Sequence, residues 1–276
     1  MNNLRRLAFI GGGNMAAALI GGLTRRGLAS GRIAVADPSA DQLDRLVRDY
    51  GVERAPDNAG AARGAEVVVL AVKPQQMRAV SLALRPHVAD SKPLVISVAA
   101  GIPHAALARW LGPEVPLVRT MPNRPALNGF GATGLYAPPS VEAAPRALAE
   151  SIMAAVSATV WVEHESQMDT VTALSGSGPA YFFLFMEALE AAAHERGLPT
   201  AIAHKLTLET AFGAAQMARQ STESLSVLRE QVTSKGGTTA AALEVLNAAG
   251  LRAIVAHAVA AADRRSAELA AEFGTP

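Results

Sequence analysis

A glycine-rich turn near the start of the chain places the strongest constraint on its fold. The segment "IGGGNMAAALIGGL" (10–23) begins at the end of a short apolar run, Leu7–Ile10. Gly11, Gly13 and Ala16 have the spacing G-x-G-x-x-A, between a predicted strand and a predicted helix. In that spacing the first glycine permits a tight turn, the second lets a phosphate approach the backbone, and the alanine permits close packing. This context predicts a dinucleotide site, although a glycine-rich turn without a ligand has the same composition.

The same stretch has some features of a secretory leader or a membrane helix. Arg5 and Arg6 precede 17 residues, Leu7 to Leu23, but five of these are glycine. A membrane helix needs about 20 largely apolar residues, and a leader needs an uninterrupted apolar stretch before its cleavage site. We therefore expect neither membrane contact nor secretion, and a cytoplasmic location.

Alternation of strand and helix patterns continues through the first part of the chain. Apolar runs such as "VVVLAV" and "LVISV" indicate strands buried on both faces, as in a parallel sheet covered by helices. The fold class expected is therefore α/β, with a mostly parallel, doubly wound Rossmann-type sheet in residues 1–163. The predicted strands are Leu7–Ile10, Ile33–Ala36, Val67–Val72, Leu94–Val98, Leu117–Met121, Ala132–Tyr136 and Thr159–Val162.

Residues 164–276 carry only helical patterns. Pro179 and Pro199 suit the first turns of two helices, and further helices are expected after Ser224, at Thr238 and from Leu251. These segments are rich in alanine and thin in bulky side chains. We therefore expect an all-α second domain that buries area against a partner copy.

Composition excludes several classes of function. There are 25 Lys and Arg against 24 Asp and Glu, and this balance gives no electrostatic basis for binding nucleic acid. The chain has no cysteine, which removes disulfides, thiolate nucleophiles and cysteine metal sites. None of the six histidines has metal-ligand or catalytic-triad spacing, so we expect no metal.

Two residues near strand ends are candidates for cofactor contacts. Asp37 follows the second strand, where an acid accepts hydrogen bonds from ribose hydroxyls and disfavours a 2′-phosphate. Asp37 can equally begin a turn before Pro38, with Ser39 capping the next helix. Lys73 follows a buried strand and is either a ribose or phosphate ligand or an ordinary solvated lysine.

A second glycine-rich segment lies in the helical half. "QVTSKGGTTAAAL" brings Ser234, Gly236, Gly237, Thr238 and Thr239 to a helix start, where successive N–H groups can hold a carboxylate. A simple helix cap is the alternative. The nearby "LSGSGPAYFF" does not match the G-x-S-x-G of serine hydrolases, so hydrolysis is dismissed.

The segment "VTSKGGTTAAALEVL" resembles the signature of the pyrroline-5-carboxylate reductase family. The order of "IGGGNMAAALIGGL", "AVKPQ", "SVAAGI", "RTMPNRP", "GATGLY", "ALSGSGPAYFF" and "RGLP" agrees, so the resemblance spans about residues 7 to 265. It implies reduction of 1-pyrroline-5-carboxylate to L-proline with NADPH or NADH, the last step of proline biosynthesis. It also implies a Rossmann domain, a helical dimerisation domain, and homodimers that often form decamers.

The resemblance also implies roles for individual residues. Thr239 would be the hydroxyl beside the ring nitrogen. The substrate would be held by Glu165, Gln231, Ser234, Gly237, Thr238 and Thr239. The cofactor would be bound by Gly11, Gly12, Gly13, Asn14, Met15, Ala16, Asp37, Ser39, Ala71, Val72, Lys73, Pro74, Val98, Ala99, Ala100, Met121, Pro122 and Asn123.

Three positions depart from the usual pattern of the family. Lys235 and Leu225 stand where prolines are common, and Arg124 stands where threonine is usual. None of these changes removes a residue that the resemblance assigns to chemistry.

Two alternatives remain open from the residues. A 3-hydroxyacid dehydrogenase or another imine reductase would share the two-domain layout, and the former would use a lysine base in the second domain. Only Lys205 and Lys235 lie there. A non-catalytic NAD(P)-binding sensor is the other alternative.

Overall fold

A sheet of eight strands organises the first part of the chain, in a computed structural model that describes residues 4–274. The strand order is β3-β2-β1-β4-β5-β6-β7-β8, and only β6 and β7 run antiparallel to each other. The predicted mostly parallel, doubly wound sheet is confirmed. The strands are β1 (Leu7–Ile10), β2 (Ile33–Ala36), β3 (Glu53–Arg54), β4 (Val67–Leu70), β5 (Leu94–Ser97), β6 (Leu117–Met121), β7 (Gly131–Tyr136) and β8 (Ser157–Trp161).

Strand β1 lies at the point where the order of the sheet reverses. Its residues pair with β2 on one side and β4 on the other, so that Leu7 faces both Ile33 and Val67. The chain leaves the sheet in opposite directions from this point, and the carboxyl ends of the strands leave a crevice there. The glycine-rich turn follows β1 directly and therefore occupies that crevice.

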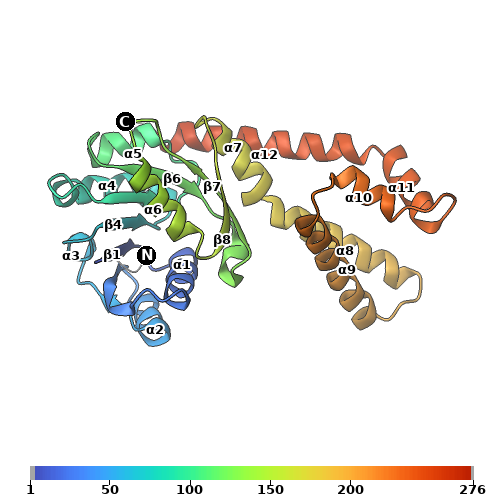
Figure 1. Ribbon diagram of the computed structural model, residues 1–276, viewed down its shortest axis with the longest axis horizontal. Helices are drawn as coiled ribbons and strands as arrows, with labels where there is room; N and C mark the ends of the chain where they lie inside the picture. Colours follow the sequence, from blue (N-terminus) through green and yellow to red (C-terminus); the bar gives the residue numbers. More distant parts are fainter. Residues whose placement is uncertain (1–3, 275–276) are drawn as a thin grey trace. The chain divides into compact units, whose positions relative to one another are not determined.

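Helices cover both faces of the sheet, which explains the unbroken apolar runs. Leu7 and Phe9 of β1 share a buried cluster with residues of α1, α2 and α6, whereas Ala8 and Ile10 share another with residues of α3, α4 and α5. Figure 1 shows these two sets on opposite sides of the strands. The bounds are α1 (Asn14–Arg25), α2 (Ala40–Tyr50), α3 (Asn58–Ala62), α4 (Pro74–Val88), α5 (His104–Leu111) and α6 (Ala143–Met153), with 3₁₀ turns η1 (Ser30–Arg32) and η2 (Arg124–Asn128).

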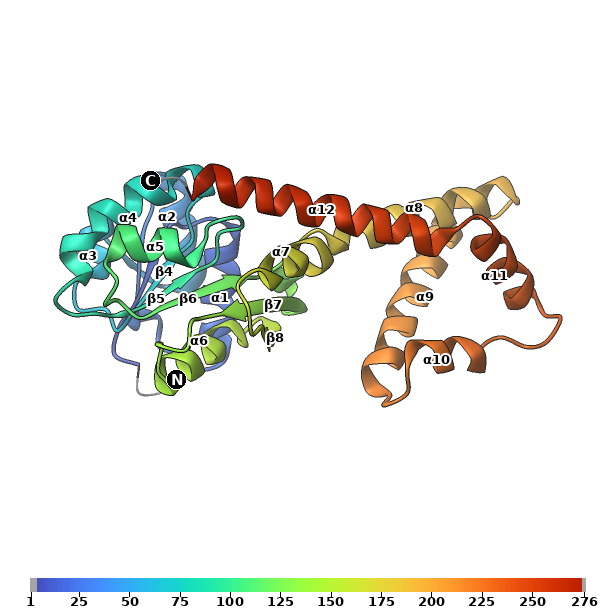
Figure 2. The same cartoon turned by 90° about the horizontal axis from the view of Figure 1, so that it is seen from above.

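After β8 the described chain is entirely helical, as predicted. Helix α8 packs against α9, and α10 and α11 follow (Figure 2). A single π-helical turn, η3, interrupts the passage into α8; such turns are rare and often lie at functional sites. The bounds are α7 (Gln167–Val171), η3 (Thr172–Gly176), α8 (Gly178–Glu195), α9 (Thr200–Gln220), α10 (Leu225–Gln231), α11 (Thr238–Ala248) and α12 (Leu251–Phe273).

Packing divides the chain into two compact units whose limits differ from the predicted boundary at 163. Residues 4–177, together with residues 261–274, form the first unit, which we call the Rossmann unit. Residues 178–260 form the second, which we call the helical unit. The end of α12 joins the Rossmann unit because Ser266 Oγ donates a 2.7 Å hydrogen bond to Asp169 Oδ1. The division into domains 1–163 and 164–276 stays a prediction.

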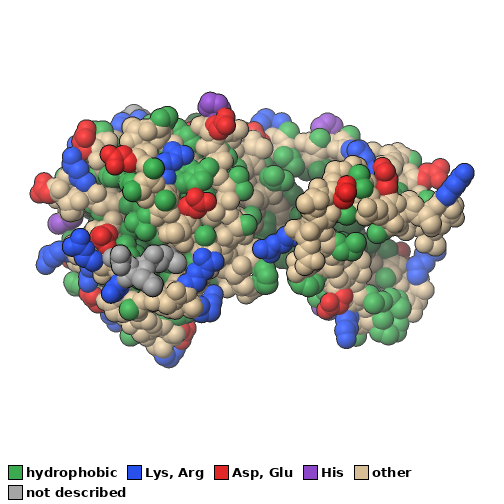
Figure 3. Space-filling model, in the orientation of Figure 1, with side chains coloured by type: hydrophobic (Ala, Val, Ile, Leu, Met, Phe, Trp, Pro, Cys, Tyr) green, Lys and Arg blue, Asp and Glu red, His purple; other side chains and the backbone are tan. Residues whose placement is uncertain are grey.

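The helical unit leaves much of its apolar surface open in the single chain. Figure 3 shows hydrophobic side chains, in green, on this unit. Phe182 is 71% exposed, Leu184 67% and Val245 68%. Helices with apolar residues on several faces require another surface to cover them. This agrees with the expectation that the alanine-rich half needs a partner.

Candidate functional site

The glycine-rich turn closes tightly against two neighbouring strands. Gly11 has φ +99°, a conformation that residues with a Cβ rarely adopt, and its N–H donates a 2.8 Å hydrogen bond to Ala36 O. A Cβ on Gly11 would lie 2.6 Å from Ala71 O. The first glycine of the motif is therefore required by the backbone itself.

The next residues of the motif prepare the start of α1. Gly13 is the N-cap of α1 with no side-chain cap, and open space lies where its Cβ would be. Asn14 and Met15 begin the helix beside this space, and Ala16 is fully buried in the core. The N–H groups of this first turn are thus free of side-chain caps, as an anion-binding helix start requires.

Asp37 is fixed by two backbone hydrogen bonds. Its Oδ2 accepts from Gly12 N at 2.7 Å, and its Oδ1 accepts from Ser39 N at 2.8 Å. Ser39 in turn caps α2, with Oγ accepting from Gln42 N at 3.4 Å. Asp37 therefore begins a turn, and its carboxylate is fixed in one orientation. A role in this turn and a role as a ribose ligand are compatible.

A cavity of about 560 Å³ lies between the turn after β1, the loops after β2 and β3, and α4. Val72, in the loop after β4, lines the cavity, whereas Lys73 is exposed as the N-cap of α4, with Pro74 as the first helical residue. Its lining is Gly11, Ala36, Asp37, Pro38, Pro56, Asp57, Asn58, Val72, Gln75, Gln76, Ala79 and Val80. Gly11, Asp37 and Val72 are among the cofactor residues expected from the sequence, whereas residues 56–58 and the four lining residues of α4 were given no role there.

Predicted residues after β5 and β6 lie at the same edge of the sheet. Ala99 is buried, while Val98 and Ala100 are half-buried. Asn123 is buried and engaged at both ends of its amide: Nδ2 donates to Ser175 O and Oδ1 accepts from Ala132 N, each at 2.9 Å. Its amide therefore ties the end of β6 to η3 and β7.

The neighbouring Met121 and Pro122 complete this edge. Met121 is half-buried and Pro122 is buried. Gly176 of η3 lies so close to Met121 that an added Cβ would be 2.6 Å from its Cε. The π-helical turn therefore packs directly behind the segment predicted to border the nicotinamide.

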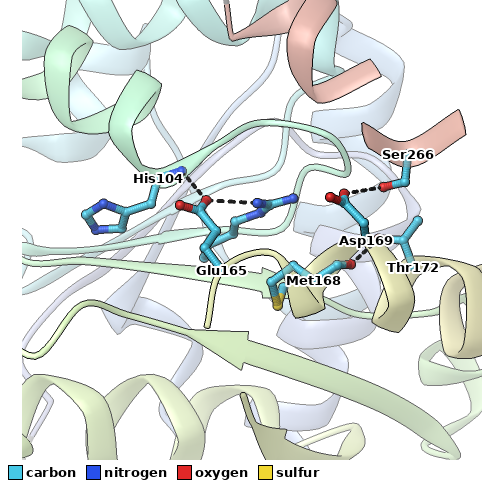
Figure 4. Close-up of polar contacts among 7 residues, drawn as sticks. His104, Glu165, Met168, Asp169, Thr172 and Ser266 are labelled. Carbon is cyan, nitrogen blue, oxygen red and sulfur yellow. Dashed lines mark hydrogen bonds and ion pairs between the residues drawn. The ribbon is translucent and has the colours of Figure 1, made fainter. Parts of the chain in front are cut away.

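Glu165 belongs to a polar cluster of the Rossmann unit (Figure 4). Its Oε1 accepts hydrogen bonds from Arg119 Nη1 at 2.8 Å and from His104 N at 2.5 Å. The Arg119 side chain is 5% exposed and that of Glu165 27%. The carboxylate thus neutralises a buried guanidinium and binds the first N–H of α5, and it lies in a different unit from the other five substrate residues.

The imidazole of His104 is packed edge-on against Tyr136, with ring centroids 6.1 Å apart. Burial lowers the pKa of His104 below its ordinary value, which the charge of Glu165 partly offsets. Its Nε2 is buried and has no partner among the described residues. Sequence reasoning assigned no role to Arg119 or His104, although an arginine inside the apolar strand "LVRTM" signals a buried ion pair.

The predicted substrate loop of the helical unit forms a glycine turn before α11. Gly236 has φ +68°, and Gly237 is the N-cap of α11 without a side-chain cap. A Cβ on Gly237 would collide with Ser234 Oγ. Thr238 and Thr239 form the first turn of the helix, so this loop has the features expected of an anion cradle. Gln231 is exposed at the end of α10.

Residues 4–274 also show how far the chain fits a metal site or a membrane span. No group of three or more His, Asp or Glu side chains there is placed to hold a metal ion. No single helix there is long and apolar enough to cross a membrane, although α11 and α12 together reach that length and composition with a 54° bend.

The chain is similar to known proteins over nearly its whole length. A family model described as pyrroline-5-carboxylate reductase dimerisation matches residues 165–269, and one described as NADP oxidoreductase, coenzyme F420-dependent, matches residues 6–101. The pyrroline-5-carboxylate reductase of Pseudomonas aeruginosa is 49% identical over 269 residues, covering 98% of both chains.

Solved structures agree with this assignment. A pyrroline-5-carboxylate reductase from Coxiella burnetii has a TM-score of 0.93 at 45% identity, covering 97% of this chain and 99% of that one. Plasmodium falciparum pyrroline carboxylate reductase, solved with NADP bound, has a TM-score of 0.85 at 29% identity, covering 98% and 99%. The expected Rossmann and helical dimerisation domains are therefore confirmed, and the chain belongs to the pyrroline-5-carboxylate reductase family.

Proposed function

We propose that this chain catalyses the last step of proline biosynthesis, the reduction of 1-pyrroline-5-carboxylate to L-proline with NADPH or NADH. The observation that carries this proposal is 49% identity to a pyrroline-5-carboxylate reductase across 98% of both chains. Membership of the family makes the chain an NAD(P)H-dependent oxidoreductase acting on a C=N bond.

The Rossmann unit has the features needed to hold the cofactor. The uncapped start of α1 and the open space at Gly13 fit a pyrophosphate, and Asp37 beside the 560 Å³ cavity fits an adenosine ribose. The remaining cofactor residues are Gly11, Gly12, Asn14, Met15, Ala16, Ser39, Ala71, Val72, Lys73, Pro74, Val98, Ala99, Ala100, Met121, Pro122 and Asn123.

The part of Asn123 in this set is to hold backbone segments, since both ends of its amide are already bonded. Those bonds fix the ends of β6 and β7 that border the proposed nicotinamide position. The bound cofactor supplies a hydride, and the protein contributes orientation and exclusion of water.

We assign the substrate carboxylate to the glycine turn before α11. Ser234, Gly237 and Thr238 would hold it with N–H and hydroxyl donors, and Gln231 would line the site. Glu165 would act by positioning, because Arg119 and the backbone of His104 already engage its Oε1. No negative charge lies within the loop 234–239 itself to oppose an anion.

Thr239 would be the catalytic residue that touches the ring nitrogen. The C=N carbon accepts a hydride more readily when the nitrogen is protonated, and solution can supply that iminium form. The Thr239 hydroxyl makes no hydrogen bond to other described residues, so it is free to bond at this nitrogen. Correct placement then supplies most of the rate, which accounts for the lack of an acidic or basic group in the motif.

Assembly and location complete the proposal. Residues 165–269 match a dimerisation family, and the exposed apolar side chains of the helical unit support an oligomer. Membership of the reductase family indicates a small-molecule substrate. We propose a homodimer that can assemble further into a decamer, located in the cytoplasm, and acting without nucleic acid or membrane.

A steady-state assay tests the function. The purified chain should oxidise NADH or NADPH when 1-pyrroline-5-carboxylate is added, and it should not do so with a 3-oxoacid. It should also restore growth to a proline auxotroph. Turnover of the 3-oxoacid would favour the hydroxyacid dehydrogenase instead, and cofactor binding without any turnover would favour the sensor.

A further inference from the structure

The charged residues that line the 560 Å³ cavity are all acidic. Asp37 and Asp57 both line it, and none of its lining residues is lysine or arginine. Two nearby cations do not alter this: Arg54 Nη1 pairs with Asp44 Oδ1 at 2.8 Å, and Lys73 is exposed outside the lining. A ligand group that enters this cavity therefore meets negative charge.

The Asp37 carboxylate is held in one orientation with acceptor capacity to spare. Gly12 N and Ser39 N each donate one hydrogen bond to a different oxygen. An ionised carboxylate has about four acceptor sites, so about two remain. These sites can accept from hydroxyl groups, such as the 2′- and 3′-hydroxyls of a ribose, but they can only repel a phosphate oxygen.

Asp57 also lines the cavity and adds a second negative charge. Its Oδ1 accepts from Gly60 N at 2.6 Å as the cap of α3, which fixes the side chain beside Pro56 and Asn58. Asp57 is exposed, so water screens it more than the half-buried Asp37. Asp37 should therefore dominate any discrimination by charge.

We infer that this cavity takes an adenosine ribose whose 2′-hydroxyl carries no phosphate, so that the chain prefers NADH to NADPH. The inference rests on the proposed function, because it assumes that the cavity is the adenosine end of the cofactor site. A 2′-phosphate carries a charge of about −1.5 to −2 at neutral pH, and it would stand at the position where Asp37 accepts the ribose hydroxyls. Like charges at an interface are a means of rejecting the wrong partner.

Kinetics with the two cofactors provide the first test. We expect kcat/KM to be at least about tenfold higher with NADH, which is the ratio that a difference of about 1.4 kcal/mol gives. The NADPH value should improve as ionic strength rises from low values, because salt screens the repulsion. Equal or better use of NADPH would overturn the inference while leaving the reductase activity established. Turnover with neither cofactor would overturn the proposed function.

Variants identify the residue responsible. Asp37→Ser should lower the NADH:NADPH ratio by about tenfold or more, with Asp37→Asn as a second variant if the first does not fold. Asp57→Asn should lower the NADH:NADPH ratio by a smaller factor, because water screens the charge of Asp57 more. This variant should still fold, since asparagine also caps helices. Asp90→Asn, which removes one exposed charge from the segment after α4, should leave the ratio unchanged. An unchanged ratio in both Asp37 variants would overturn the inference.

Binding of nucleotide fragments tests the cavity without turnover. Adenosine 5′-monophosphate and adenosine 2′,5′-bisphosphate differ only by the 2′-phosphate. Calorimetry on the full chain should show tighter binding of the monophosphate, and Asp37→Ser should reduce or reverse that difference. Tighter binding of the bisphosphate to the unchanged protein would contradict the assignment.

Discussion

Removal of the Glu165 carboxylate should destabilise the Rossmann unit strongly. In Glu165→Ala the Arg119 guanidinium, whose side chain is only 5% exposed, loses the carboxylate that neutralises it. Loss of one partner from a buried ion pair costs about 3–5 kcal/mol. The Glu165 side chain is 27% exposed, so water reaches the position and we take the lower value, about 3 kcal/mol. At about 2–4 °C per kcal/mol for a unit of this size, Tm should fall by about 6–12 °C.

Thermal unfolding monitored by circular dichroism measures this change, at one protein concentration because oligomers stabilise with concentration. Glu163→Ala is the matched control: Glu163 is exposed and only its backbone N–H is bonded, to Gln167 Oε1. Its Tm should change by no more than about 2 °C. The double variant Arg119→Met with Glu165→Ala should be more stable than Glu165→Ala alone, because it leaves no buried unpaired charge. A fall no larger than that of the control, or strictly additive effects in the double variant, would refute the ion-pair argument.

Three further changes separate binding, chemistry and pH dependence. Thr239→Ala should lower kcat by about 10- to 100-fold, as expected for loss of one hydrogen bond to the reacting group, and should change NADH affinity little. Stopped-flow turnover measures the rate and cofactor titration measures the affinity. Equal losses in rate and affinity would refute the role of Thr239. Gly11→Ala should weaken cofactor binding at least about tenfold or prevent folding, since its Cβ would lie 2.6 Å from Ala71 O at φ +99°. Calorimetry measures the cofactor affinity, and circular dichroism shows whether the variant folds. A folded variant with unchanged affinity would contradict the geometry. Burial lowers the pKa of His104 in the folded chain, so the unfolded chain binds more protons than the folded chain as pH falls through about 6.5. The folded state is therefore fully stable with respect to this group above that pH and loses stability below it. The Tm of His104→Phe should fall less steeply between about pH 7.5 and 5.5, and an unchanged slope would exclude His104 as a cause.

The sheet was predictable because burial on both faces leaves its mark in consecutive apolar residues. Strands β1, β2 and β6 begin and end at the predicted residues. Strand β3 was missed because Glu53–Arg54 is short, polar and exposed, and only its position at the edge of the sheet makes it a strand. The π-helical turn at Thr172–Gly176 was missed for a related reason, since no residue pattern distinguishes it from α-helix.

The sequence indicates where the proposed site residues lie along the chain, but not what their side chains contact. Gly11 and Asp37 follow from local spacing, because a tight turn after one strand and an acid after the next meet wherever those strands pair. Glu165 and Asn123 do not, since their partners are distant in sequence: 46 residues separate Glu165 from Arg119, and 52 separate Asn123 from Ser175. A resemblance can assign a role to a position in the sequence. The number of acceptor sites that the side chain there has left for a ligand depends on these tertiary hydrogen bonds.

This difference decides which of the proposed residues can act on a ligand directly. Each Asp37 oxygen accepts one backbone hydrogen bond and can still accept from a ribose, whereas Glu165 Oε1 already accepts from the buried Arg119 guanidinium and from the first N–H of α5. A substitution at Asp37 should therefore act first on cofactor preference, and one at Glu165 should act first on stability. If Glu165→Gln kept the Tm of the unchanged protein but raised the KM for pyrroline-5-carboxylate by about tenfold, the carboxylate would contact substrate, and its assignment to positioning would have to be withdrawn.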